Sequence, residues 1–205
     1  MSETAVFETT TEALIAEYLP DGAAEAYLDA LLEENERVNL VSRETSKEDL
    51  RRLIAESLLP LHFIETVPRS YLDIGSGGGF PAIPLMQALI RQGTAPEAIL
   101  MEPRQKKSAA LRRICLSLGL KPDILKEQFP EKVPLRKFDL ITVRLVKITP
   151  ILLKAALKSL SAKGEFAYFG HLDNNLTIPE TACKYIAYRL DKSASVKAIS
   201  LISKN

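Results

Sequence analysis

From residue 69 onward, short apolar runs alternate regularly with longer amphipathic segments. The apolar runs cover residues 70–74, 98–102, 123–127, 138–143 and 164–170, and helix-like segments cover 81–92, 104–120 and 148–160. Because strands buried on both faces read as continuous apolar runs, this alternation predicts an α/β fold, a mostly parallel sheet with helices on both sides. Two final runs, 183–190 and 195–203, lie close together and predict an antiparallel hairpin at one edge.

The first third of the chain has a helical pattern instead. Apolar residues recur at helical spacing in segments 11–19, 23–41 and 46–61, and the last of these opens on Ser46 with Asp49 three residues later, a variant of the capping box. We therefore expect an N-terminal helical appendage over residues 1–66 and the α/β domain over residues 67–205. The length of 205 residues and a hydrophobic content of 46% are enough for a buried core.

The overall composition excludes several classes of protein but does not point to one function. The net charge of +1 gives no whole-molecule attraction to nucleic acid. Cys115 and Cys183 have no metal-binding spacing, so we expect no metal and two buried free thiols. Without a basic, apolar leader or a long apolar run, the chain is expected to be a cytoplasmic protein with no membrane association, and we expect a monomer.

The loop that follows the first apolar run is built for close contact with a ligand. It reads "DIGSGGGFP" from Asp73 to Pro81, and its glycines allow positive φ and close approach to the backbone. Tight strand-to-helix packing is the alternative use of such a loop. Gly77, Gly79 and Ala82 also fit a dinucleotide fingerprint, whereas no Gly-Lys-Ser/Thr follows to make a phosphate-binding P-loop.

The pattern Asp73-x-Gly75-x-Gly77-x-Gly79 resembles motif I of class I S-adenosylmethionine-dependent methyltransferases, which have a Rossmann-like sheet. The resemblance implies S-adenosyl-L-methionine as cofactor, with Asp73 facing its cationic end. Glu102, which ends the second run, would receive the ribose hydroxyls, although an acid there also serves NAD. The loop residues implied to bind the cofactor are Asp73, Gly75, Ser76, Gly77, Gly79 and Phe80.

Further segments narrow the resemblance to the RsmG/GidB family over roughly residues 30 to 170. These segments are "NLVS" at 39–42, "RLIAESL" at 52–58, "DIGSGGGFPAIPL" at 73–85, "EPRQKKSAALRRI" at 102–114 and "FDLITVR" at 138–144. The family methylates guanine N7 in small-subunit (16S) ribosomal RNA, so ribosomal RNA or the small ribosomal subunit is the implied partner. The position of Gln128 matches a family loop segment and is implied to contact the cofactor.

Guanine N7 methylation agrees with what the chain lacks. N7 carries a free lone pair, so no general base is needed. An Asn/Asp-Pro-Pro-aromatic segment, expected for amine methylation, is absent after residue 143, and neither cysteine ends a strand as a nucleophile would. Arg144 leaves the fourth run at a position where the family has an arginine; it is our candidate catalytic residue and also a candidate cofactor contact. Pairing with a nearby acid explains Arg144 equally well.

A cluster of basic residues is a candidate phosphate-binding face, although such residues on helices are more often simply solvated. The cluster comprises Arg43, Lys47, Arg51, Arg52, Arg104, Lys106, Lys107, Arg112 and Arg113.

Four positions depart from the family pattern: Leu53, Val143, Pro130 and Phe169. We expect the acceptor site to be less polar as a result and ribosomal RNA methylation to be slow. A diverged enzyme acting on a small molecule and a non-catalytic cofactor-binding protein are the alternatives.

Overall fold

The computed structural model describes residues 6–172, 181–192 and 194–204. Its elements in chain order are β1 (Phe7–Thr9), α1 (Thr11–Tyr18), α2 (Ala23–Asn35), α3 (Lys47–Phe63), β2 (Ser70–Ile74), α4 (Ala82–Arg91), β3 (Glu97–Met101), α5 (Gln105–Ser117), β4 (Asp123–Leu125), β5 (Phe138–Val143), α6 (Pro150–Ser159), β6 (Leu160–Tyr168), β7 (Thr181–Leu190) and β8 (Lys197–Lys204). The helical and strand segments expected from the sequence are all present with ends shifted by up to four residues, except that the helix expected over 23–41 ends at Asn35.

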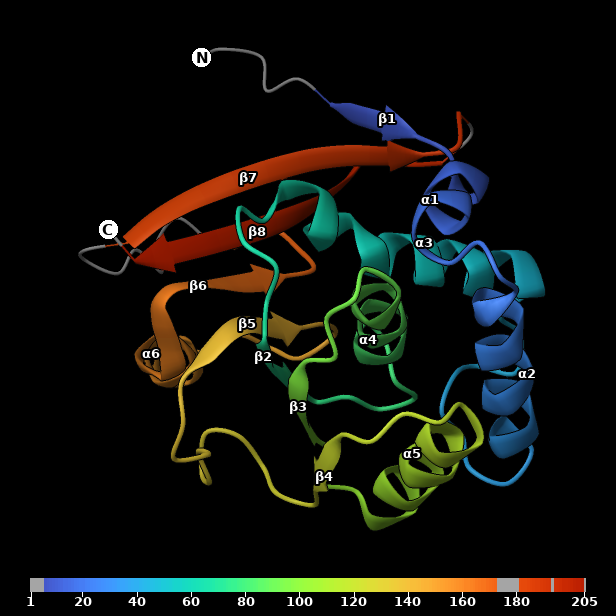
Figure 1. Cartoon of the computed structure of the whole chain (residues 1–205), viewed down its shortest axis with the longest axis horizontal. Helices are drawn as coiled ribbons and strands as arrows, with labels where there is room; N and C mark the ends of the chain where they lie inside the picture. The colour runs from blue at the N-terminus through green and yellow to red at the C-terminus, as the bar shows by residue number, and fades with distance from the viewer. Residues whose placement is uncertain (1–5, 173–180, 193, 205) are drawn as a thin grey trace.

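The strands form one eight-stranded sheet in the order β1-β7-β8-β6-β5-β2-β3-β4 (Figure 1). Strands β2 to β6 pair in parallel, and β8 runs antiparallel to both β6 and β7. This confirms the predicted mostly parallel α/β sheet with an antiparallel C-terminal hairpin. The chain moves outward from β2 in one direction through β3 and β4, and then restarts on the other side at β5. Ligands of open α/β sheets bind at such a switch point, beyond the carboxyl ends of the strands.

One strand was not predicted. β1 pairs in parallel with the far end of β7, Phe7 opposite Tyr188 and Thr9 opposite Leu190. The C-terminal hairpin is therefore covered at its outer edge by the N-terminus, and the first third of the chain is not wholly helical. A three-residue strand has too few positions to display an alternating pattern, so the sequence gives no local signal for it.

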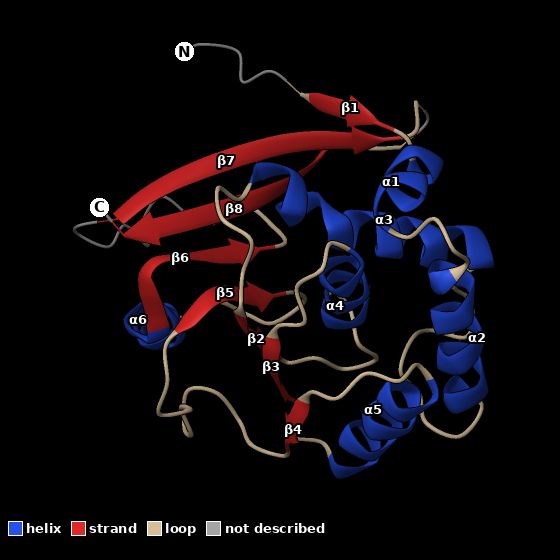
Figure 2. Cartoon of the chain, viewed as in Figure 1, coloured by secondary structure: helices blue, strands red, loops and turns tan. Residues whose placement is uncertain are grey.

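Helices cover both faces of the sheet, as Figure 2 shows. Alternate strand residues point to opposite faces: Tyr71 and Leu140 join a core with α1 to α5, and Leu72 and Ile141 join a second core with α6.

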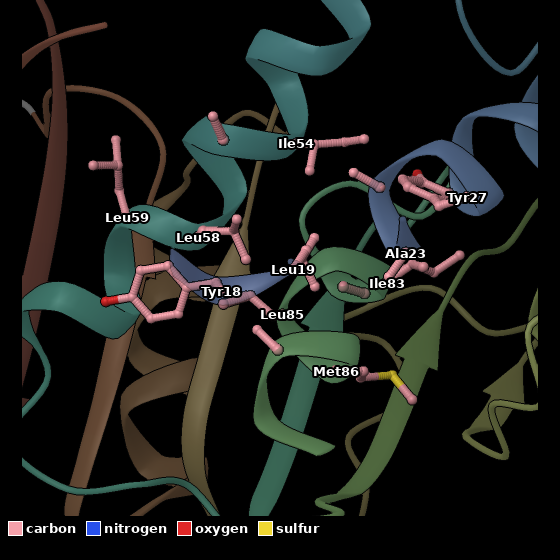
Figure 3. Close-up of a cluster of buried hydrophobic side chains, with 14 of the residues drawn as sticks. Tyr18, Leu19, Ala23, Tyr27, Ile54, Leu58, Leu59, Ile83, Leu85 and Met86 are labelled. Atoms are coloured by element: carbon pink, nitrogen blue, oxygen red, sulfur yellow. The ribbon is translucent and has the colours of Figure 1, made fainter. Parts of the chain in front are cut away.

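The N-terminal helices share a core with the sheet domain (Figure 3). Tyr18 and Leu19 at the end of α1 and Leu58 of α3 lie beside Leu85 and Met86 of α4, all of them buried. α3 begins at its predicted cap, where the Ser46 hydroxyl accepts from the backbone N–H of Asp49. The boundary between residues 66 and 67 stays a prediction.

Candidate functional site

The glycine-rich loop leaves β2 and is held against the end of β3. The backbone N–H groups of Gly75 and Ser76 both donate to the carbonyl of Met101, at 2.9 and 3.0 Å. Gly79 closes the turn by donating to the Ser76 carbonyl at 2.7 Å. The loop is therefore a fixed structure that presents its backbone at the carboxyl edge of the sheet.

Two of the glycines are required by both backbone angle and space. Gly75 has φ +79°, and an added Cβ would lie 2.5 Å from Val146 Cγ2. Gly79 has φ +106°, and its Cβ would lie 2.5 Å from Ile83 Cδ1. Any L-residue would be strained at these angles and would collide with a neighbour, so the loop depends on glycine at both positions.

Helix α2 contacts the loop through Tyr27. The buried Tyr27 hydroxyl donates to the carbonyl of Gly78 at 3.0 Å, and its ring packs on Phe80 with centroids 5.1 Å apart. Asn35, at the end of α2, accepts from the backbone N–H groups of Leu40 and Val41. The N-terminal helices thus fix both the loop and a neighbouring wall.

Glu102 binds backbone groups with both carboxylate oxygens. Oε2 accepts from the N–H of Gly77 and Oε1 from the N–H of Arg104, each at 2.9 Å. The side chain is almost fully buried, at 5% exposure. Each carboxylate oxygen can accept a second hydrogen bond, so Glu102 keeps capacity for ribose hydroxyls while it holds the loop.

Asp73 is a buried carboxylate with one oxygen unused. Thr142 donates its hydroxyl to Oδ1 at 2.5 Å, and the Tyr71 hydroxyl lies 2.6 Å from that of Thr142. Oδ2 is buried and has no hydrogen-bond partner among the described residues. Burial raises the pKa of Asp73 to about 7, and the charge of Glu102 adds to this, against the lowering by hydrogen bonds from Thr142 and Ser76. Such a carboxylate suits a cationic group brought to it by a ligand.

A cavity of about 330 Å³ opens beside the loop. Six of the predicted site residues line it, and these are Gly75, Ser76, Gly77, Phe80, Glu102 and Arg144. Asp73 and Gly79 are buried and do not line the cavity. Other walls come from residues 40–41, from Leu53 of α3, from Gly78, and from residues 103–104, 107 and 145–146.

Gln128 is not brought to the cavity lining. It is exposed, while its neighbour Phe129 is buried against the α6 face of the sheet. Because Phe129 fills the core there, the backbone directs the Gln128 side chain outward. Its cofactor role stays a prediction.

Arg144 makes the ion pair that the sequence left as an alternative. Its Nη2 donates to Glu56 Oε2 at 2.5 Å, and the other oxygen of Glu56 accepts from Lys197. Glu56 is 2% exposed and Arg144 is 10% exposed at the side chain. Arg144 also lines the cavity, and its Nη1 is buried without a partner among the described residues. One donor group of the guanidinium is therefore fixed by Glu56 and another lacks an acceptor.

The residue after Arg144 stands at the rim of the cavity. Leu145 has φ +56° and is 95% exposed, although it is a large apolar residue. Leucine rarely adopts this left-handed conformation, which costs roughly 1 kcal/mol or more. The turn places Arg144 inward and Leu145 outward, while Val146 packs against Gly75.

The four departures from the family pattern lie in different surroundings. Leu53 lines the cavity, and the Phe169 ring lies 5.3 Å from the guanidinium carbon of Arg144. Val143 is fully buried in β5, and Pro130 follows buried Phe129. Only Leu53 and Phe169 of these therefore bear directly on the cavity or on Arg144.

Three supporting residues were missed by sequence reasoning: Tyr27, Glu56 and Lys197. They come from α2, α3 and β8, far apart in the chain. For Glu56 a signal exists, because it is the one acid in the apolar segment of residues 53–61.

The cysteines are not nucleophiles of this site. Cys115 is buried in α5, and burial raises its pKa to about 12, which keeps the thiol protonated. Cys183 is exposed, so the expectation of two buried thiols was wrong for it; burial along β7 increases only from Ile186 onward.

In the described parts of the chain, no group of three His, Cys, Asp or Glu is placed to hold a metal, and no helix is long and apolar enough to cross a membrane.

Comparisons with known proteins agree with this geometry. Ribosomal RNA small subunit methyltransferase G of Helicobacter pylori (strain J99) is 37% identical over 162 residues, which is 77% of this chain and 86% of that protein. The protein of the same name from Pelagibacter ubique is 29% identical over 76% of this chain and 73% of its own length. The solved O-methyltransferase from Bacillus cereus, in complex with SAH, has the same fold with a TM-score of 0.62 at 14% identity, covering 95% of this chain and all of that one.

The family model GidB, described as rRNA small subunit methyltransferase G, matches residues 22–197, which include the N-terminal helices α2 and α3 as well as the sheet. Since that match spans most of the chain and holds the loop, Glu102 and Arg144, this protein belongs to the GidB family of ribosomal RNA small subunit methyltransferases.

Proposed function

We propose that this protein transfers the methyl group of S-adenosyl-L-methionine to N7 of a guanine in small-subunit ribosomal RNA. The observation that carries the proposal is the cavity itself, where the glycine loop and Glu102 face an arginine that has a donor to spare. Family membership supports the RNA substrate.

The cofactor fits the groups that the chain provides. Asp73 has a buried oxygen without a donor among the described residues, which a cationic amino-acid end would satisfy. Glu102 retains acceptor capacity for two ribose hydroxyls. The backbone of residues 75–77 lies at the cavity wall with no side chain beyond that of Ser76. When bound, S-adenosyl-L-methionine supplies a methyl group on a positively charged sulfur.

The chain does not need a general base for this reaction. The N7 lone pair of guanine takes the methyl group, and no proton has to leave the base. The protein's contribution is then to hold the two reactants in line and to exclude water.

Arg144 is suited to hold guanine by one contact. A bidentate arginine contact would use both O6 and N7 of guanine, and it would block the lone pair that must react. Glu56 engages one side of the guanidinium, so Nη1 is left to donate to O6 alone. Glu56 also offsets the charge of Arg144 next to a base that becomes cationic on methylation.

Location and assembly belong to the same proposal. We place the protein in the cytoplasm, acting as a monomer on the small ribosomal subunit or its RNA. The names of the bacterial relatives, which give small-subunit ribosomal RNA as the substrate, support the RNA partner.

A panel of acceptors tests the function. Purified protein is given S-adenosyl-L-methionine labelled in its methyl group, together with naked small-subunit RNA, assembled small subunits or a metabolite extract. Label in RNA is expected. Label only in small molecules would indicate a diverged enzyme, and cofactor binding without any transfer would indicate a non-catalytic protein.

A further inference from the structure

The predicted basic cluster divides into two groups in the structure. Four of its members are already engaged within the protein. Arg51 pairs with Glu12 and Glu25, Arg52 with Glu48 and Asp49, Arg113 with Glu34, and Arg112 donates to the carbonyl of Ile124. Internal partners therefore occupy part of each of these four guanidinium groups.

Four members without an ion pair gather beside the cavity, whereas Lys47, exposed at the start of α3, lines neither the cavity nor its neighbouring depressions. Among the described residues, none of Arg43, Arg104, Lys106 and Lys107 has a carboxylate within salt-bridge distance. Arg104 and Lys107 line the cavity itself, Arg43 lines a depression over residues 39–44, and Lys106 lines another beside Val38 and Asn39.

The three hollows adjoin one another, because they share lining residues. Lys107 lines all of them, and Arg104 lines both the cavity and the depression beside Asn39. We call the two depressions, with walls at residues 38–44 and 104–107, the basic trough. Four cations line the trough and the adjoining cavity edge, and the carboxylate in the lining of the depressions is Glu44.

The backbone of the trough adds to its positive character. The trough holds the start of α5, a 13-residue helix whose N-cap, Arg104, makes no side-chain capping bond. Its first N–H groups and the helix dipole attract an anion. The opposite wall is kept in place by Asn35, which binds the N–H groups of Leu40 and Val41.

We infer that the basic trough holds the phosphate backbone of the substrate RNA next to the guanine that enters the cavity. The inference rests on the proposed function. A small acceptor would occupy only the cavity, whereas separate cations along a trough that leads out of it match the repeated charge of a single strand. The trough also explains how a chain of net charge +1 binds a polyanion.

The salt dependence of RNA binding tests the inference. For a single strand, the slope of log K against log salt concentration is about −0.7 for each phosphate neutralised. The variant Arg43→Gln with Lys106→Gln removes two trough cations that do not line the cavity. Its slope for in vitro transcribed small-subunit RNA should be shallower by about 1.4, and its affinity for S-adenosyl-L-methionine should stay within twofold of the wild type.

The matched control is Lys154→Gln with Lys163→Gln, which removes the same net charge from exposed sites on α6 and β6. This control should keep the wild-type slope. An unchanged slope in the trough variant, or an equal change in the control, would overturn the inference. Methyl transfer to RNA by the wild-type protein is measured alongside, because its absence would refute the proposed function, whereas transfer with an unchanged slope would refute only the trough.

Discussion

Replacing Asp73 by asparagine should make the cofactor-free protein less sensitive to pH. Asp73 is 1% exposed, and burial raises its pKa from 3.8 to about 7. Below pH 3.8 the carboxyl is neutral in both the folded and the unfolded state. Between pH 3.8 and about 7 the unfolded state loses the proton and the folded state keeps it, so the free energy of unfolding falls as pH rises.

The size of the effect follows from the shift. Each pH unit in that window removes about 1.4 kcal/mol, so the whole shift of about three units corresponds to about 4 kcal/mol. Between pH 5 and pH 8 the loss is about 3 kcal/mol, complete once pH exceeds about 7. The amide that replaces the carboxyl group is neutral throughout, so the variant should lack this loss.

Urea denaturation at pH 5 and pH 8, followed by circular dichroism, measures the difference. Asp139→Asn is the matched control: burial raises the pKa of Asp139, but hydrogen bonds with Ser161, Ser70 and the backbone of Arg69 bring that pKa below its usual value. The carboxyl of Asp139 is therefore ionised in both states from pH 5 to pH 8, and this variant should keep the wild-type pH dependence over that range. The stabilisation by Asp139 is present above the unfolded pKa and lost on acidification. Parallel pH curves for wild type and Asp73→Asn would refute the reasoning.

The Asp73 variant should also bind S-adenosyl-L-methionine more than about tenfold more weakly, because a charge-assisted contact is lost.

Three further changes probe the rest of the site. Glu56→Ala leaves Arg144 and Lys197 without their shared carboxylate and should lower the free energy of unfolding by about 3 kcal/mol. Lys197→Met should lower it less. If Glu56→Ala is as stable as the wild type in urea, the ion-pair account is wrong. Gly79→Ala should destabilise the protein more than Gly77→Ala in the same assay. Both glycines have positive φ, but of the two only a Cβ at residue 79 would lie 2.5 Å from a side chain. The reverse order would show that this close contact does not determine the loss of stability. Arg144→Ala should lower kcat at least about tenfold and change cofactor affinity by no more than a few fold, and an equal loss of both would assign Arg144 a purely structural role.

Much of the fold follows from local sequence pattern. Segments such as 70–74 and 138–143 are apolar on both faces, and only the interior of a parallel sheet accommodates them. The short strand β1 was not predicted, because its pairing partner, β7, lies about 180 residues away in the chain and three residues are too few to show an alternating apolar pattern. Its place at the outer edge depends on tertiary contact alone.

Part of the candidate site could likewise be predicted from local sequence, and part of it could not. Asp73 and the glycines are close together in the sequence, so their spacing is visible. Glu102 was found because it ends a predicted strand next to theirs. Glu56 stands out as the one acid in residues 53–61, but nothing local links it to Arg144 or to Lys197 on β8. The basic cluster was overestimated for a related reason, since ion pairs such as Arg113 with Glu34 join residues from different helices.

The most direct measurement is a methyl-transfer assay on small ribosomal subunits purified from cells that lack the native enzyme. The purified protein is incubated with these subunits and with S-adenosyl-L-methionine that carries a deuterated methyl group. The ribosomal RNA is then digested to nucleosides and analysed by mass spectrometry. We predict deuterated N7-methylguanosine, formed more slowly than with a relative that has the usual family residues at the positions of Leu53 and Phe169, and lost in Arg144→Ala. Deuterium in another nucleoside, or in none while the cofactor is bound, would contradict guanine N7 methylation.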